Sequence, residues 1–243
     1  MVSSALPRPR WRKVVYWAAL VALLAGNVVL VFACLEFYRR EQRVRLHPTS
    51  KVPASTVGQE PRTAVLFLGD SRMQEWPDLP HDRFATVNAG GGGETTAQIL
   101  IRTGPTLEAT RPEVVVLQAG VNDLKAIGAL PDMARQIEAE CIANLAAMIE
   151  LCRARGARVV LVPVLPTAEP SLARRLVWSS EIDAARLRVN AALQERFAGA
   201  AGVALLDENL LHAGHDDYRD TLHFTPAAYR KLESATLKAI SPP

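Results

Sequence analysis

Ser71 is the residue whose position first suggests chemistry. It follows the apolar run Ala64–Leu68 and the turn residues Gly69 and Asp70. A short apolar run without alternation predicts a strand that is buried on both faces. Reactive groups in open α/β sheets lie just beyond the carboxyl ends of such strands. A serine there can act as a nucleophile once a base removes its proton. A helix N-cap is the alternative role, because Asp and Ser both cap helices.

Three further segments carry groups that complement a reactive serine. The glycine run 90–93 and Asn122 each follow a predicted strand, and Asp220 and His223 precede the last predicted helix. A histidine can take the serine proton, and a carboxylate can orient that histidine. Glycine amides and an asparagine side chain can bind the oxyanion of a tetrahedral intermediate, where one donor contributes about 3–4 kcal/mol. These residue types together predict acyl transfer through a serine.

The elements that would position these groups alternate along the chain. Strands are predicted at residues 64–68, 84–88, 113–118, 158–164 and 203–206, and helices at 96–102, 131–155, 181–197 and from 226 onward. Strands that alternate with helices predict a parallel sheet covered by helices on both faces. We therefore expect an α/β fold, a flavodoxin-like three-layer α/β/α sandwich around a five-stranded parallel sheet.

The N-terminal part of the chain has a different composition. Residues 1–13 form a short basic tail, and residues 14–38 are predicted to be a transmembrane anchor helix. The apolar run within it is about 22 residues long, enough to cross a hydrocarbon core of roughly 30 Å. It is also longer than the apolar region of an ordinary signal peptide. A charged segment rich in Pro, Ser and Thr, residues 39–62, is predicted to link it to a domain at residues 63–243.

Two alternatives to an uncleaved anchor stay open. The apolar run also fits a cleaved signal, and Val31-Phe32-Ala33-Cys34 resembles a lipoprotein processing site in which Phe32 fits poorly. Basic residues flank the run on both sides, so the positive-inside rule gives little contrast. The short basic tail favours a domain outside the cytoplasm, which would be periplasmic in a Gram-negative cell.

Charge and cysteine content exclude some functions. The net charge is only +3, and much of the basic excess lies near the N-terminus. A nucleic-acid partner is therefore not expected, because it would need a basic face on the folded domain. Cys141 and Cys152 fall in one predicted helix, roughly 16 Å apart by its rise per residue. That separation exceeds the limit for a disulfide of about 7 Å between Cα atoms.

Four short blocks in order resemble the SGNH, or GDSL-type, hydrolases. The blocks together span most of the domain, and each is weak without the others. They are Gly69-Asp70-Ser71, Asn88–Thr96 with its glycine run, Gly120-Val121-Asn122-Asp123 and Asp220-Thr221-Leu222-His223.

The resemblance implies a role for each matching residue. Ser71 would be the nucleophile, His223 the general base and then acid, and Asp220 the group that orients His223. The oxyanion hole would consist of the Ser71 and Gly93 amides and the Asn122 side chain, with Gly90 as the runner-up to Gly93. Candidates for substrate binding are Arg72, Gly90, Gly92 and Asp123.

Arg72 departs from the family motif, which has leucine at that position. An arginine there would form a local ion pair or contact an anionic group of the substrate. The ion pair is the favoured expectation, because most arginines are solvated or paired.

Other chemistries fit these residues less well. The segment from His212 to His223 also contains His215, Asp216 and Asp217, a ligand-rich loop that would suit a metal-dependent hydrolase. Gly69–Met73 lacks the second glycine of the Gly-x-Ser-x-Gly motif of α/β-hydrolases. The glycine run lacks the lysine of a phosphate-binding loop. We expect neither a metal nor another cofactor.

The resulting hypothesis is a membrane-tethered serine esterase or acylhydrolase. It would cleave acyl esters, most simply short-chain or acetyl esters, through a Ser-His-Asp triad and an acyl-enzyme. The ester could belong to a small molecule, a lipid or a glycan. An O-acyltransferase of cell-envelope glycans is one alternative, because the same catalytic residues serve both reactions. A non-catalytic binding domain of the envelope is the other.

Overall fold

The chain comprises two units, each of which has its own structure. The units are residues 1–41 and residues 42–243. The computed structural model describes residues 11–46, 63–80, 83–172, 174–213 and 216–240.

The helix α1, Trp11–Leu46, contains the predicted anchor. Within the described residues, one helix is long and apolar enough to cross a membrane, over Lys13–Leu46, although a signal sequence has the same properties. The helix continues past residue 38 into the segment predicted as a linker. Residues 39–46 contain no Gly or Pro that would stop it, and Arg40 pairs with Glu36 one turn earlier. The rest of the predicted linker, residues 47–62, lies outside the described residues.

The second unit is built on a five-stranded sheet. Every neighbouring pair of strands is parallel, and the order is β2-β1-β3-β4-β5. This is the flavodoxin-like order, in which the carboxyl ends of all strands share one edge of the sheet. The strands are β1 Thr63–Gly69, β2 Phe84–Gly90, β3 Val114–Gln118, β4 Arg158–Leu161 and β5 Val203–Leu205.

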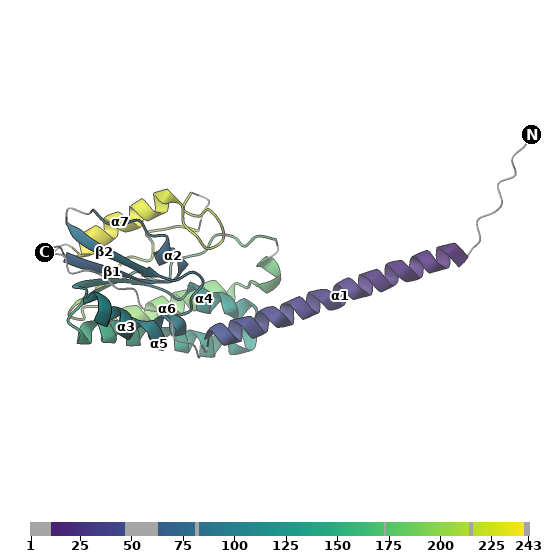
Figure 1. Cartoon of the computed structure of the whole chain (residues 1–243), viewed down its shortest axis with the longest axis horizontal. Coiled ribbons are helices and arrows are strands. Elements are labelled where there is room, and N and C mark those ends of the chain that lie inside the picture. The colour runs from purple at the N-terminus through teal and green to yellow at the C-terminus, as the bar shows by residue number, and fades with distance from the viewer. Residues whose placement is uncertain (1–10, 47–62, 81–82, 173, 214–215, 241–243) are drawn as a thin grey trace, which may run out of the picture. The chain divides into compact units, whose positions relative to one another are not determined.

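Helices cover both faces of the sheet, which confirms the predicted α/β/α class. The helix α7 lies on one face, and α3, α5 and α6 lie on the other (Figure 1). The α-helices of this unit are α2 Ser71–Gln74, α3 Thr96–Thr110, α4 Val121–Leu124, α5 Ala134–Ala154, α6 Glu181–Phe197 and α7 Pro226–Ile240. Short 3-10 helices are η1 Lys125–Gly128, η2 Pro131–Met133 and η3 Arg174–Val177.

The inner strand β1 is buried on both faces. Val65 and Phe67 belong to the core cluster that also contains Leu232 of α7. Leu66 and Leu68 alternate with them and are equally inaccessible to solvent. Successive side chains of a strand point to opposite faces, so both faces of β1 require apolar residues. The burial of both faces explains why the apolar run Ala64–Leu68 does not alternate with polar residues.

The helix α3 and the strand β4 differ most from the prediction in where they end. The helix α3 continues to Thr110 despite Pro105, because Ile99, Thr103 and Leu107 keep one face of it buried. Packing of an apolar face contributes most of a helix's stability in a protein. In contrast, β4 ends at Leu161 rather than at residue 164. Pro163 has no N–H to donate, so it cannot continue the ladder.

Substitution of Gly69 by alanine tests the close packing of β1 against β3. A Cβ at this position would lie 2.0 Å from the carbonyl oxygen of Gln118 on β3. We expect Gly69→Ala to lower the free energy of unfolding by about 1–3 kcal/mol, as overpacking does. Gly104→Ala is the matched control, because its Cβ would meet only one atom at 3.8 Å, and it should stabilise α3 by about 0.5–1 kcal/mol. Urea denaturation would show both changes, and a Gly69→Ala variant as stable as the parent would contradict the first expectation.

Candidate active site

Ser71 lies where β1 meets the short helix α2. Asp70 is the N-cap of this helix, and its Oδ1 accepts a hydrogen bond of 2.9 Å from the Arg72 amide. Asp70 therefore has the capping role that was considered as an alternative. Ser71 is the first helical residue and is partly accessible to solvent, at the carboxyl edge of the sheet.

Asp220 and His223 lie at the tip of a folded-back loop before α7. Tyr218 and Phe224 form an antiparallel bridge at its base, and the Arg219 amide donates to the His223 carbonyl at 3.0 Å. Asp220 Oδ1 accepts hydrogen bonds from the amides of Leu222, at 2.7 Å, and His223, at 3.0 Å. The loop is thus a defined turn that presents both side chains in one direction.

A continuous hydrogen-bonded path joins the three side chains. His223 Nε2 lies 3.1 Å from Ser71 Oγ, and His223 Nδ1 lies 2.8 Å from Asp220 Oδ2. Burial would raise the pKa of Asp220, but hydrogen bonds from Leu222 and His223 outweigh it and lower this pKa to about 2. Asp220 is therefore ionised at neutral pH and can accept the Nδ1 proton. That leaves Nε2 as an acceptor for the serine proton.

Asn122 lies at the end of β3, in α4. Its Nδ2 donates to the Glu94 carbonyl at 2.9 Å, and its Oδ1 accepts from Lys125 Nζ at 2.6 Å. Lysine can only donate, so its position assigns the amide orientation of Asn122. An amide nitrogen carries two protons, and Glu94 uses one of them. The second proton has no acceptor among the hydrogen bonds of the described residues, and the Asn122 side chain is itself buried.

The glycine run begins at the end of β2. Gly93 has a positive φ of 73°, a backbone conformation that residues with a side chain rarely adopt. Among the described residues, no hydrogen bond uses the amides of Ser71 or Gly93. Gly92 is exposed. Gly90 differs, because its amide donates to Asn88 Oδ1 at 2.9 Å. This bond occupies the amide of Gly90, the runner-up to Gly93 as an oxyanion donor, and disfavours Gly90 in that role. Its candidacy for substrate binding stays a prediction.

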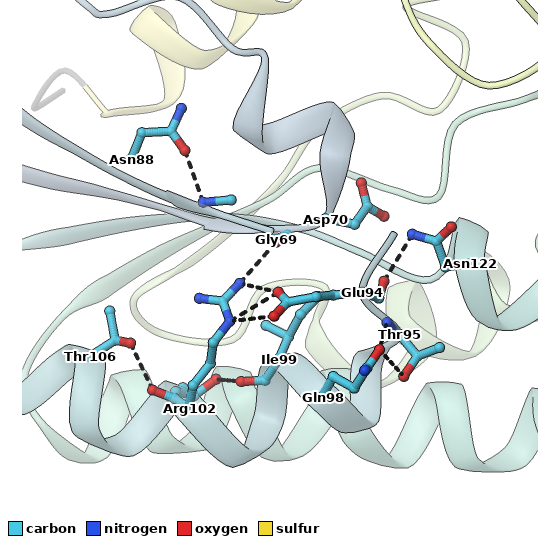
Figure 2. Close-up of polar contacts among 12 residues, drawn as sticks. Gly69, Asp70, Asn88, Glu94, Thr95, Gln98, Ile99, Arg102, Thr106 and Asn122 are labelled. Carbon is cyan, nitrogen blue, oxygen red and sulfur yellow. Dashed lines mark hydrogen bonds and ion pairs between the residues drawn. The ribbon is translucent and has the colours of Figure 1, made fainter. Parts of the chain in front are cut away.

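A buried ion pair that the motifs did not reveal supports the glycine run. Arg102 of α3 donates to both carboxylate oxygens of Glu94, and its Nη2 also donates to the Gly69 carbonyl at 3.1 Å (Figure 2). Glu94 in turn holds Asn122 through its own carbonyl. Gly91 leaves room for this carboxylate, since a Cβ there would lie 2.0 Å from Glu94 Oε2. The sequence signal for this ion pair was weak: Arg102 follows Glu94 by eight positions, about two helical turns.

Arg72 and Asp123, both candidates for substrate binding, are buried, and the ion pair that was the favoured expectation for Arg72 is not formed within the described residues. Arg72 is 1% exposed, and in the described part of the chain its guanidinium bonds three backbone carbonyls and no carboxylate. Asp123 is 2% exposed and accepts hydrogen bonds from the Thr96 amide and hydroxyl at 2.9 and 2.6 Å. Motif position alone does not distinguish an exposed polar side chain from a buried one.

The loop considered for a metal is organised by other contacts. Asp217 is buried and pairs with Lys231 Nζ at 2.7 Å. Its second oxygen accepts from the His212 amide at 3.2 Å. The described residues contain no group of three or more His, Cys, Asp or Glu side chains that could hold a metal ion. His215 lies outside the described residues.

The titration of Asp123 gives a prediction for stability. Burial raises the pKa of Asp123 from 3.8 to about 7, although the Thr96 hydrogen bonds oppose it. The folded protein then holds this proton up to a higher pH than the unfolded chain does. The contribution of the Asp123 proton to the free energy of unfolding is therefore complete below pH 3.8. It is lost as the pH rises towards 7.

We expect Asp123→Asn to flatten the fall in stability between pH 4 and pH 7. Urea midpoints measured across this range for the parent and the variant would show the difference. Thr96→Ser keeps the hydroxyl beside Asp123 and should retain the parental pH dependence. Equal slopes for parent and Asp123→Asn would show that Asp123 does not titrate in this range.

Comparisons with known proteins agree with this architecture. The chain matches the GDSL-like lipase/acylhydrolase family over residues 56–231. No curated protein matches it. The following solved structures share its fold. A GDSL-like lipase from Bacteroides thetaiotaomicron has a TM-score of 0.58 at 22% identity, covering 86% of this chain and 98% of that one. A lipase/acylhydrolase from Enterococcus faecalis has a TM-score of 0.52 at 23% identity, covering 73% and 94%.

An esterase also has this fold. A catalytic mutant of an acetylxylan esterase from Geobacillus stearothermophilus has a TM-score of 0.55 at 17% identity, covering 79% of this chain and 97% of that one. The family match extends over most of the second unit and includes all four motif blocks. The chain belongs to the GDSL-like lipase/acylhydrolase family and is a hydrolase of ester bonds.

Proposed function

We propose that the protein is a serine esterase that uses Ser71, His223 and Asp220 as a catalytic triad. One observation carries the proposal: the path from Ser71 Oγ through both ring nitrogens of His223 to Asp220, with contacts of 3.1 and 2.8 Å. Serine and histidine are 152 positions apart in the chain. Hydrogen-bonded contact across such a separation, with an ionised acid behind the imidazole, is the arrangement that activates a hydroxyl nucleophile.

In the acylation step, Ser71 Oγ attacks the ester carbonyl carbon while His223 Nε2 takes the hydroxyl proton. The ester C=O electrons move to its oxygen, which becomes the oxyanion of a tetrahedral intermediate. Collapse of this intermediate breaks the bond to the alcohol oxygen, which leaves with the proton from His223. Asp220 stays ionised and stabilises the imidazolium during the step.

The oxyanion would be bound by the amides of Ser71 and Gly93 and by Asn122 Nδ2. Two observations support this set. The two amides take part in no other hydrogen bond among the described residues, and one Asn122 proton remains after the bond to Glu94. Lys125 on the Asn122 oxygen polarises the amide towards stronger donation. Donors that are already oriented need no reorganisation as the charge develops.

In the deacylation step, water takes the place of Ser71 as the nucleophile, and Ser71 becomes the leaving group. His223 removes a proton from water, the hydroxide attacks the acyl carbon, and Ser71 leaves with the proton. We propose short acyl esters, such as acetyl esters, as substrates. The acetylxylan esterase that shares the fold is consistent with this choice.

Loss of the nucleophile or the base should abolish turnover. With the full chain in detergent, we expect Ser71→Ala and His223→Ala to reduce p-nitrophenyl acetate hydrolysis at least about 1,000-fold. Fluorophosphonate should label the parent protein and not Ser71→Ala. Ser171→Ala is the matched control and should retain activity, because Ser171 is exposed and its one hydrogen bond within the described residues is from the Arg175 amide to its carbonyl. A series of acyl chain lengths should show the highest rate for the shortest esters.

Each other outcome contradicts part of the proposal. Turnover that persists in Ser71→Ala but is lost with a chelator would favour a metal-dependent hydrolase. Absence of labelling and turnover in a folded parent protein would favour a non-catalytic binding domain. A rate that increases with acyl chain length would contradict the short-chain substrate.

We also propose that α1 tethers the enzyme to a membrane, with the second unit outside the cytoplasm. The support is the length and apolar composition of the helix, together with the exposure of its large apolar side chains. The full chain should stay with the membrane fraction after alkaline carbonate extraction. Protease added to cells with a permeable outer layer should digest the second unit. Release of a shortened chain from the membrane would indicate a cleaved signal instead.

A further inference from the structure

Arg72, the residue after Ser71, connects the start of α2 to two distant segments. Each nitrogen of its guanidinium donates to a different backbone carbonyl. Nε bonds Leu222 at 2.8 Å, Nη1 bonds Leu165 at 3.0 Å and Nη2 bonds Pro166 at 2.9 Å. The planar fork of arginine points its donors in fixed directions towards separate acceptors, whereas the three donors of a lysine ammonium lie on one compact, rotatable group.

Two of the groups that Arg72 contacts are the chain neighbours of His223. The Leu222 carbonyl immediately precedes this histidine. The ring of Phe224, which immediately follows it, lies 4.6 Å from the guanidinium carbon. Cation–π contact at this distance is attractive, more so where water is excluded. One side chain therefore contacts both chain neighbours of His223, the carbonyl of Leu222 and the ring of Phe224.

The same cluster fixes Arg72 itself. The Tyr229 hydroxyl of α7 donates to the Arg72 carbonyl at 2.8 Å, and the Tyr218 hydroxyl donates to the Pro166 carbonyl. Ser71 and His223 are thus joined through their backbone neighbours as well as through their side chains. Displacement of the loop that carries His223 would break the bond to Leu222.

Filling space does not account for an arginine at this position. The guanidinium is 1% exposed, and burial of a charge costs several kcal/mol. The leucine of the family motif would fill apolar space without this cost. An arginine can offset this cost when its N–H groups form hydrogen bonds. Here they bond the backbone carbonyls of Leu222, Leu165 and Pro166.

We infer that Arg72 is a positioning residue that sets the distance between Ser71 Oγ and His223 Nε2 by holding Leu222 and Phe224. The inference rests on the proposed function of Ser71 and His223. A misplacement of about 1 Å at reacting groups can lower a rate about 100-fold. Loss of Arg72 should therefore reduce kcat and leave KM nearly unchanged, since the side chain does not reach the substrate.

A double-mutant cycle tests this inference. Hydrolysis of p-nitrophenyl acetate would be measured for the parent, Arg72→Leu, His223→Ala and the double variant, with Ser71→Ala as the blank. We expect Arg72→Leu to lower kcat about 10- to 100-fold with KM within about threefold. In the His223→Ala background, Arg72→Leu should change the residual rate less than about twofold, because a residue that acts through His223 has no effect without it.

The control is Arg158→Leu, which also removes an arginine bonded to a carbonyl, that of Ile240 at 2.9 Å. Arg158 opens β4 at the opposite edge of the sheet, so kcat should be retained. If Arg72→Leu does not fold, Arg72→Lys replaces it in the cycle, since it keeps the charge and loses the fork. An unchanged kcat, or an equal loss in both backgrounds, would overturn the inference. If Ser71→Ala retained the activity of the parent protein, the proposed function would be overturned instead.

Discussion

The carbonyl oxygen of Gly69 is the point on which the arrangement of this edge of the sheet depends. It accepts a hydrogen bond from the Gly91 amide at 2.9 Å and another from Arg102 Nη2 at 3.1 Å. The end of β1, the glycine run and α3 therefore meet at one acceptor. The absence of a side chain at Gly69 lets β1 approach Gln118 closely. Ser71 leaves the sheet two residues later, at a place that these contacts determine.

Buried charges around the site all hold backbone. Arg102 binds Glu94 and the Gly69 carbonyl, Arg72 binds three carbonyls, and Asp123 binds the start of α3. Buried ionic groups add little to net stability, because desolvation offsets their attraction. Their directional hydrogen bonds do restrict where a loop can lie. In this protein they surround the partly accessible Ser71 and His223 with groups that have little freedom to move.

The sequence was sufficient to predict the class of fold and where the reactive groups gather. The apolar run before Ser71 and the alternation of strands with helices both depend on local patterns, which survive in the linear chain. The roles of Arg72, Gly90 and Asp123 could not be predicted in this way. The Gly90 amide bonds to the side chain of Asn88, two residues earlier. Arg72 and Asp123 are hidden from solvent and bond to groups distant in the chain, which motif position does not reveal. Arg102 was missed for the same reason, because its partners at residues 69 and 94 become neighbours only in the folded sheet.

The loop that carries His223 also has a consequence for biosynthesis. Ser71 belongs to the first strand-to-helix turn of the second unit, and its partner follows 152 positions later. A ribosome must therefore translate almost the whole unit before the two side chains can meet. The growing polypeptide therefore contains Ser71 without its partner for most of its synthesis. The contact between Ser71 and His223 can form only after the loop before α7 has been made.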